Sequence, residues 1–275
     1  MTTTHPRPAT VGENSLYQQL RGHLANLKLT ASAEALPGVL DQAQAEGLSM
    51  TATLERLLAI EVEATEARRL AGRLRFASIP TPATLEDFDP DAQPGVDPAL
   101  LAELGTCRYL ETATNVLLIG PPGVGKTHIA AGLARRAAET GYRTYFTTAA
   151  DLAARCHRAA IEGRWNYTMR FFAGPTLLVI DELGYLSLPD EAASALFQVV
   201  SQRYLKSSIV ITTNRGVAAW GDILGDTTVA AAMLDRLLHR SVVINLDGDS
   251  YRLRDHHART DTLRRTTTGN RNPLP

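Results

Sequence analysis

The chain has very little lysine and very little cysteine. Only three lysines occur among its 28 basic residues, Lys28, Lys126 and Lys206. Nearly all other basic residues are arginine, so a lysine at position 126 stands out in this sequence. The two cysteines, Cys107 and Cys156, lie far apart and show no metal-ligand spacing, which excludes a disulfide framework and a cysteine-based metal site. They are typical of reduced residues in a cytosolic protein.

Long apolar runs are also missing. No run approaches the roughly 20 residues that a membrane-spanning helix needs, and the polar N-terminus lacks the apolar core of a signal peptide. We therefore expect a cytoplasmic protein that makes no contact with a membrane.

The chain has no excess of charge of either sign. Its formal net charge is −1, so the overall balance does not indicate a nucleic-acid partner. The charge is uneven along the chain, however: residues 81–115 hold seven acids and one arginine, and residues 251–275 hold six arginines and two aspartates. We expect both segments to be solvated and flexible.

The most informative stretch is Gly120–Thr127, which reads GPPGVGKT and matches the phosphate-binding P-loop in full. The apolar run Asn115–Ile119 leads into it and the helix-forming stretch His128–Glu139 follows it, as the motif requires. The glycines let backbone N–H groups point at phosphate oxygens, and the helix N-terminus adds a partial positive charge. Lys126 can reach the outer phosphates, and the Thr127 hydroxyl can ligate Mg²⁺. The residues expected to bind the nucleotide are Gly120, Pro121, Pro122, Gly123, Val124, Gly125, Lys126, Thr127 and His128.

Leucines at helical spacing dominate the first quarter of the chain. They predict a small all-helical domain over residues 15–78, interrupted at Pro37 and Gly38. Residues 1–14 are rich in threonine and proline and are predicted to be disordered, and residues 79–98 predict a linker rich in proline and acids. The last expected helix of the region 15–78 has four arginines near its C-terminal end. They either complement the helix dipole or bind phosphate or a partner. These are Arg68, Arg69, Arg73 and Arg75.

Strand and helix patterns alternate over residues 99–254. Strands are expected at Asn115–Ile119, Tyr142–Thr148, Thr176–Ile180, Ser207–Thr212 and Ser241–Leu246. Helices are expected at Pro98–Glu111, His128–Glu139, Ala150–Gly163, Asp190–Tyr204 and Val229–His239. The alternation predicts an α/β domain whose parallel sheet is covered by helices on both faces. Residues 255–275 are expected to form a tail rich in arginine and threonine.

Two acids follow the most apolar of the expected strands. Asp181 and Glu182 come at its carboxyl end, where parallel sheets place groups that handle ligands. Asp181 is suited to hold Mg²⁺ together with Thr127, and Glu182 is suited to polarise a water for attack on the γ-phosphate. A water-activating glutamate argues against a small-molecule kinase, which needs no such base.

Two further residues are candidates for catalysis. Asn214 ends the next strand and can help to place the attacking water, although asparagine at a strand end is also a common turn residue. Arg236 lies in the helix before the last strand, where its guanidinium can reach the ATP of a neighbouring subunit. A surface pair of Asp235 with Arg236 is the alternative, and Arg240 is a nearby competitor for the same role.

Arginines and aromatic residues alternate around the expected helix at Ala150–Gly163. This composition can hold phosphates and stack bases, but it is more often that of a solvated face with Trp165 in the core. The candidate DNA contacts are Arg155, Arg158, Arg164 and Arg170, with Trp165 and Tyr167 among them.

Taken in order, five segments of the chain resemble one family. They are GPPGVGKTHIA, LLVIDELGY, ITTNR, MLDRLLH and DSYRLR. The set resembles the IstB-type helper ATPases of bacterial insertion sequences, which belong to the AAA+ class and are close to the DnaC-type helicase loaders. The resemblance extends to the helical N-terminal region and to LEDFD at Leu85–Asp89.

The resemblance implies a role for each matching residue. Gly120–Thr127 would be Walker A, Asp181 and Glu182 Walker B, Asn214 sensor I, Arg236 the arginine finger and Arg252 the sensor II arginine. It also implies an AAA+ ATPase domain, with ATP and Mg²⁺ as ligands. The implied partners are double-stranded DNA read with little sequence preference, a transposase of the same insertion sequence, and further copies of the chain assembled with ATP.

Three other functions stay open at this point. A DnaC-type replicative helicase loader would use its N-terminal domain to bind a helicase instead of a transposase. A P-loop nucleotide kinase would transfer the phosphate to an acceptor other than water. An oligomeric scaffold with a degenerate ATPase would not depend on Glu182.

Overall fold

The computed structural model describes residues 11–185, 190–248 and 250–251. Arg252 and the expected tail at 255–275 lie outside these residues. The chain separates into two compact units, Met1–Ala71 and Gly72–Pro275. The boundary lies within one helix, α3 (Met50–Ala77), so residues 72–77 of that helix belong to the second unit. No helix in the described parts of the chain is long and apolar enough to cross a bilayer.

The first unit consists of α1 (Val11–Asn26), α2 (Thr30–Glu46) and most of α3. Its small core is formed by Leu24, Ala33, Leu36, Val39 and Leu57. The expected interruption at Pro37 is wrong, because α2 continues through it. Leu36 and Val39 are buried on either side of the proline, so packing holds the helix where local preference would end it. The first helix also begins at Val11, four residues before the expected start.

One buried carboxylate connects α2 to α3 in this unit. Glu61 accepts a hydrogen bond from the backbone N–H of Ser32 at 2.9 Å and one from Arg68 Nη2 at 2.7 Å. The Ser32 hydroxyl donates to the carbonyl of Leu57 at 3.0 Å. The bond from the Ser32 amide, followed by the bond from Arg68, lowers the pKa of Glu61 below its ordinary value. Arg68 is therefore partly occupied in holding the unit together.

The second unit is built on a five-stranded sheet in which every pairing is parallel, with strand order β2-β3-β4-β1-β5. The strands are β1 (Asn115–Ile119), β2 (Thr144–Thr148), β3 (Leu177–Leu183), β4 (Ser208–Thr213) and β5 (Ser241–Asn245). The helices that follow α3 are α4 (Pro98–Gly105), α5 (Lys126–Glu139), α6 (Ala149–Ile161), α7 (Trp165–Ala173), α8 (Asp190–Arg203), α9 (Trp220–Leu224) and α10 (Thr227–Leu238). Short 3₁₀ turns occur at Pro90–Ala92, Arg108–Leu110 and Val217–Ala219. The predicted α/β class is confirmed, while α7 and α9 were not anticipated.

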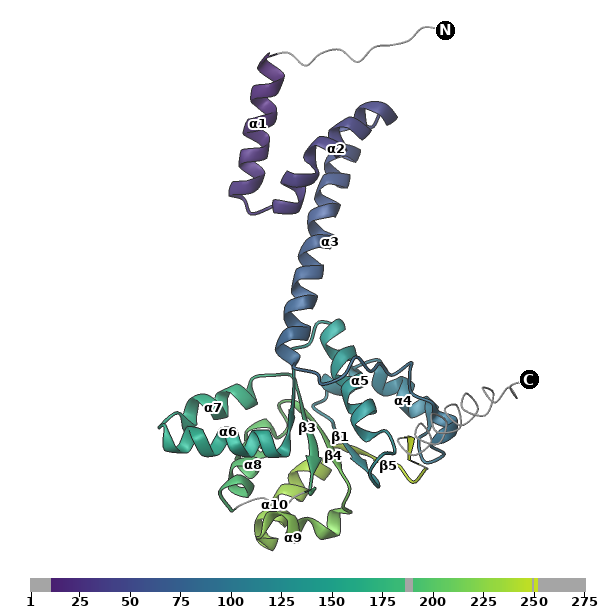
Figure 1. Ribbon diagram of the computed structural model, residues 1–275, viewed down its shortest axis with the longest axis vertical. Coiled ribbons are helices and arrows are strands. Elements are labelled where there is room, and N and C mark those ends of the chain that lie inside the picture. The colour runs from purple at the N-terminus through teal and green to yellow at the C-terminus, as the bar shows by residue number, and fades with distance from the viewer. Residues whose placement is uncertain (1–10, 186–189, 249, 252–275) are drawn as a thin grey trace, which may run out of the picture. The chain divides into compact units, whose positions relative to one another are not determined.

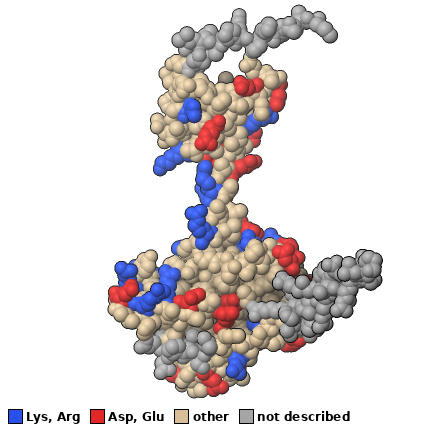
Figure 2. Space-filling view, viewed as in Figure 1, with Lys and Arg blue, Asp and Glu red and all other residues tan. Residues whose placement is uncertain are grey.

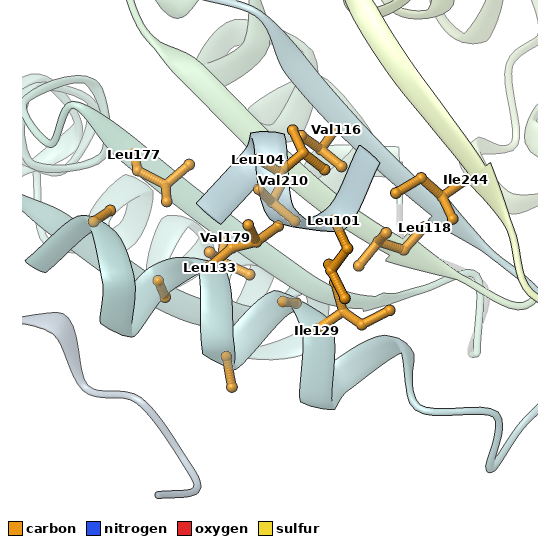
Figure 3. Close-up of a cluster of buried hydrophobic side chains, with 14 of the residues drawn as sticks. Leu101, Leu104, Val116, Leu118, Ile129, Leu133, Leu177, Val179, Val210 and Ile244 are labelled. Carbon is orange, nitrogen blue, oxygen red and sulfur yellow. The ribbon is translucent and has the colours of Figure 1, made fainter. Parts of the chain in front are cut away.

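Neighbouring residues along each strand point to opposite faces of the sheet, and both faces are buried by helices. Val116 and Leu118 of β1 join the cluster on the side of α4 and α5, whereas Leu117 joins the cluster formed with α6 to α10. Figure 1 shows α5 on one side of the sheet and α6, α7 and α8 on the other. Figure 3 shows how the first cluster is filled. It labels Leu101, Leu104, Val116, Leu118, Ile129, Leu133, Leu177, Val179, Val210 and Ile244.

Candidate nucleotide-binding site

The loop between β1 and α5 has the backbone that a phosphate cradle needs. Gly123 and Gly125 have φ values of 88° and 97°, in the left-handed region that favours glycine. A Cβ at Gly125 would also lie 2.9 Å from the ring of Phe88. Gly125 is the N-cap of α5, so the first amides of that helix face the loop.

Lys126 is held at the mouth of this loop. Its Nζ donates to the carbonyl oxygens of Gly120 and Pro121, both at 2.7 Å. The bonds fix the ammonium on the loop that is expected to wrap the phosphates. Contact of the lysine with the outer phosphates stays a prediction.

Asp181 lies at the centre of a network of hydroxyl groups. Its side chain is buried and accepts from Thr127 Oγ1 at 3.0 Å, and it also accepts from the hydroxyl of Thr212. The structure therefore brings the two predicted metal ligands, Thr127 and Asp181, into direct contact. Among the described residues there is no group of three or more histidines, cysteines or acids that could hold a metal. A site with one hydroxyl and one carboxylate fits Mg²⁺, which keeps several waters and takes its other ligands from phosphate oxygens.

Glu182 has an unusual backbone. Its φ is 62°, which is rare for a residue with a side chain, and conformations of this kind cost about 1–3 kcal/mol and cluster at functional sites. The expectation placed Glu182 after the strand, but β3 continues to Leu183, with an irregularity in its pairing to β4 at this point. The side chain is exposed in the cavity described below, as a water-activating base must be.

Asn214 follows β4 and lines the same cavity. Its Oδ1 is buried, and no hydrogen bond from the described residues reaches it. A buried amide oxygen without a protein partner is suited to accept from a water or ligand. Its role in placing the attacking water stays a prediction.

These residues surround one cavity of about 590 Å³. Its walls include Lys126, Thr127, Glu182 and Asn214, together with Phe88. The volume is within the usual range for a small-molecule site, about 300–1,000 Å³. The cavity is large enough for a nucleotide.

The segment expected to be a flexible linker forms one wall of this cavity. Phe88 is buried, and its ring centroid lies 5.9 Å from that of His128 and 6.2 Å from that of Tyr251. His128 Nε2 lies 2.9 Å from the carbonyl oxygen of Thr84. Tyr251 donates its N–H to the carbonyl of Gly123 at 3.0 Å and its hydroxyl to the carbonyl of Asp89 at 2.5 Å. Within residues 81–93, Phe88 and Gln93 are buried, while Glu86, Asp87, Asp89 and Asp91 are exposed. Leu85 and Phe88, apolar at a spacing of three among acids, were the available signal.

The two arginines proposed to reach another subunit do not line this cavity. Arg236 lies over the ring of Phe197 at 5.0 Å and donates Nη1 to the carbonyl of Ala232 at 2.7 Å. Arg240 is exposed and donates to the carbonyl of Thr112 at 3.3 Å. A role for either residue at the ATP of a neighbouring subunit stays a prediction.

The arginines of α6 and α7 differ in their surroundings. Arg155 is stacked at 3.7 Å over Phe171 and lies 3.4 Å from the hydroxyl of Tyr145, so much of it is engaged in packing. Arg158 and Arg164 are exposed and line a shallow groove of about 310 Å³, and Figure 2 shows basic atoms gathered on this side of the second unit. Arg170 is also exposed and donates Nε to the carbonyl of Asn166 at 3.2 Å. Among the aromatic residues, Trp165 packs against the core and Tyr167 is exposed.

A protein-family comparison matches residues 22–259 to the family of IstB-like ATP binding proteins. The chain belongs to this family. It is 40% identical over 238 residues to a protein of Geobacillus stearothermophilus named for ATP binding and for insertion sequence IS5376, covering 86% of this chain and 95% of that protein. It is 37% identical over 245 residues to a protein of insertion sequence IS21 from Pseudomonas aeruginosa, covering 89% and 92%. The predicted resemblance to IstB-type proteins is confirmed.

Solved structures support the same fold. DnaA from Aquifex aeolicus bound to AMPPCP aligns with a TM-score of 0.51 and 20% identity over 62% of this chain and 51% of that chain. DnaI aligns with a TM-score of 0.51 and 17% identity, covering 60% of this chain and 91% of that chain. At such identities the likeness concerns the fold alone, and it agrees with the α/β fold built on a five-stranded parallel sheet.

Proposed function

We propose that this IstB-like protein hydrolyses ATP with Mg²⁺, assembles with further copies of itself on double-stranded DNA and stimulates the transposase of its own insertion sequence. The observation that carries the catalytic part is that Lys126, Thr127, Glu182 and Asn214 line one cavity, and that the buried Asp181 accepts a hydrogen bond from Thr127. The transposition part is supported by the relatives, which are named for insertion sequences.

Each residue has a distinct part in this proposal. The amides of the loop and Lys126 bind the phosphates. Thr127 and Asp181 would hold Mg²⁺, whose positive charge would offset the charge that develops on the phosphate oxygens. Glu182 takes a proton from the attacking water, and Asn214 Oδ1 accepts its other hydrogen bond. The buried ring of Phe88 and the wall around it exclude bulk water from the opposite side.

Assembly and DNA binding rest on residues outside this cavity. Arg236, with Arg240 as the competitor, would meet the ATP of a neighbouring copy and stabilise charge in the transition state. Arg158, Arg164 and Arg170 are exposed, so we expect them to contact DNA phosphates without reading sequence. Arg155 would act mainly by holding α6 against α7.

Glu182→Gln is the central test. The glutamine keeps the size and loses the base, so we expect ATP binding within about threefold of the unchanged protein and turnover lowered by about 10²-fold or more. Gel filtration and electron microscopy with ATP and duplex DNA should show a larger assembly that persists in this variant. Asp222→Asn, an exposed acid on α9 away from the cavity, is the matched control and should hydrolyse ATP normally.

Three results would point to the other functions. A degenerate ATPase would leave turnover unchanged in Glu182→Gln. A nucleotide kinase would give a phosphorylated acceptor in place of free phosphate. A helicase loader would recover a replicative helicase in a pull-down, where we expect the transposase.

A further inference from the structure

Thr212 of β4 contacts both acids of β3 with a single buried hydroxyl group. Its Oγ1 accepts the backbone N–H of Glu182 at 2.9 Å and donates its proton to Asp181 Oδ1. Because an amide only donates and a carboxylate only accepts, the donor and acceptor capacities of the hydroxyl are both used. We propose that Thr212 is a positioning residue that sets Asp181 for the metal and Glu182 for the attacking water. This inference rests on the proposed ATPase function.

The sheet explains why a side chain is needed here. Ile180 pairs with Ile211 and Leu183 pairs with Thr213, so Asp181 and Glu182 together lie opposite Thr212 alone. An extra residue in one strand leaves a backbone group without its ladder partner. The Thr212 hydroxyl supplies the acceptor that the N–H of Glu182 lacks. It thereby holds Glu182 at its left-handed φ of 62°.

Asp181 accepts from a second hydroxyl group, which comes from another element. Thr127 at the start of α5 donates at 3.0 Å to Oδ2, while Thr212 donates to Oδ1. The carboxylate is therefore fixed from the helix and from the neighbouring strand. Thr127 is itself an expected metal ligand, whereas Thr212, which also borders the cavity, has its hydroxyl bonded to the two acids. Groups that orient metal ligands in this way commonly change metal affinity or activity by about 10–100-fold when they are removed.

A purely structural role makes the opposite prediction for two substitutions. If Thr212 only fills space in a buried strand, valine should replace it well and serine should leave a gap. If the hydroxyl positions the acids, serine should preserve the site and valine should disturb it. Thr144 of β2 provides the matched control, because it is equally buried in the same sheet and makes no contact with either acid.

The experiment compares Thr212→Val, Thr212→Ser and Thr144→Val in the full-length protein. Steady-state hydrolysis gives kcat and KM, and electron paramagnetic resonance gives the affinity for Mn²⁺ in the presence of a non-hydrolysable ATP analogue. For Thr212→Val we expect kcat to fall by about 10-fold or more, KM to change less than about threefold, and Mn²⁺ affinity to fall by about 10-fold. Thr212→Ser should stay within about threefold in all three quantities, as should Thr144→Val.

Two results would overturn the inference. One is a Thr212→Val protein whose Mn²⁺ affinity equals that of the wild-type protein and whose kcat, if the wild-type protein hydrolyses ATP, is also equal. The other is a Thr212→Ser or Thr144→Val protein as impaired as Thr212→Val. If the unchanged protein binds the ATP analogue but does not hydrolyse ATP, the proposed function fails, and the Mn²⁺ comparison still decides the role of Thr212.

Discussion

Arg203 of α8 donates Nη2 to the carbonyl oxygen of Ser208, the first residue of β4, at 2.6 Å. The same guanidinium donates to three other carbonyls, those of Phe172, Pro175 and Thr176. The side chain is 1% exposed. It connects the end of α7 and the starts of β3 and β4. Burial lowers the pKa of Arg203 to about 9, so the group stays protonated at neutral pH.

Arg203→Met should strongly destabilise the second unit. The substitution keeps most of the volume but leaves four buried carbonyls without this donor, and each buried polar group that loses its partner costs about 1–3 kcal/mol. We expect the free energy of unfolding to fall by about 3 kcal/mol or more, which lowers the melting temperature by roughly 6–12 °C in a unit of this size. Thermal unfolding followed by circular dichroism measures it. Arg108→Met is the control at an exposed arginine, and an equal melting temperature for the two variants would contradict the role of Arg203.

The parts of the site that the sequence predicted are those encoded by neighbouring residues. In GPPGVGKT the glycines, the lysine and the threonine act through the local loop and the helix that follows it, so the motif carries its own geometry. Asp181 and Asn214 were also predictable, because the carboxyl ends of parallel strands meet at one edge of a sheet. The contact of Thr212 with Asp181 and Glu182 is not predictable in this way, since it depends on the register between β3 and β4.

The parts that were missed depend on contacts between distant residues. Residues 81–93 have the composition of a solvated segment, but Gln93 Oε1 accepts the N–H of Gly248 at 3.1 Å across 155 positions. Arg203 likewise resembles an ordinary surface arginine at a helix end until its four carbonyl partners are assembled. Pro37 was expected to end a helix that packing maintains. In each case tertiary burial overrides the local preference.

Gly248→Ala tests whether the wall at residues 81–93 supports nucleotide binding. A Cβ at Gly248 would lie 2.6 Å from the carbonyl oxygen of Ala92 and against the side chain of Gln93, so the segment must shift. We expect ATP to bind about 10-fold more weakly, a loss of roughly 1.4 kcal/mol, and amides of residues 84–93 to exchange faster. Isothermal titration with an ATP analogue and hydrogen exchange measure these effects. Gly216→Ala, where a Cβ meets nothing within 4 Å, should change neither quantity.

Equal ATP affinity in the two glycine variants would show that the wall is not needed for binding. Faster exchange at residues 84–93 without a change in affinity would lead to the same conclusion. Phe88 would then pack against its neighbours in the protein without contributing to the affinity for ATP.

Removing two exposed arginines should lower the affinity for DNA and make this affinity less dependent on the salt concentration. Each phosphate contact contributes about 0.9 to the slope of log affinity against log salt concentration. For Arg158→Ala with Arg164→Ala we expect a slope reduced by about 2 and weaker binding to duplexes of every sequence. Fluorescence anisotropy with labelled duplexes at several salt concentrations, in the presence of an ATP analogue, measures both. Arg108→Ala removes an exposed arginine from the α4 side and should leave the slope unchanged.

The bond between Glu61 and the Ser32 amide should make the first unit sensitive to acid. Because the folded state lowers the pKa of Glu61, its contribution is present above the ordinary value of about 4.5 and is lost as the pH falls through the folded value. We therefore expect the protection of α2 amides against hydrogen exchange, corrected for the intrinsic rates, to be constant near pH 6 and to fall below pH 4.5. Glu61→Gln should show reduced protection at pH 6 and little further loss on acidification, because glutamine does not titrate. Glu66→Gln, on the exposed side of α3, is the control. A parallel acid loss in the Glu61→Gln protein would assign the pH dependence to another group.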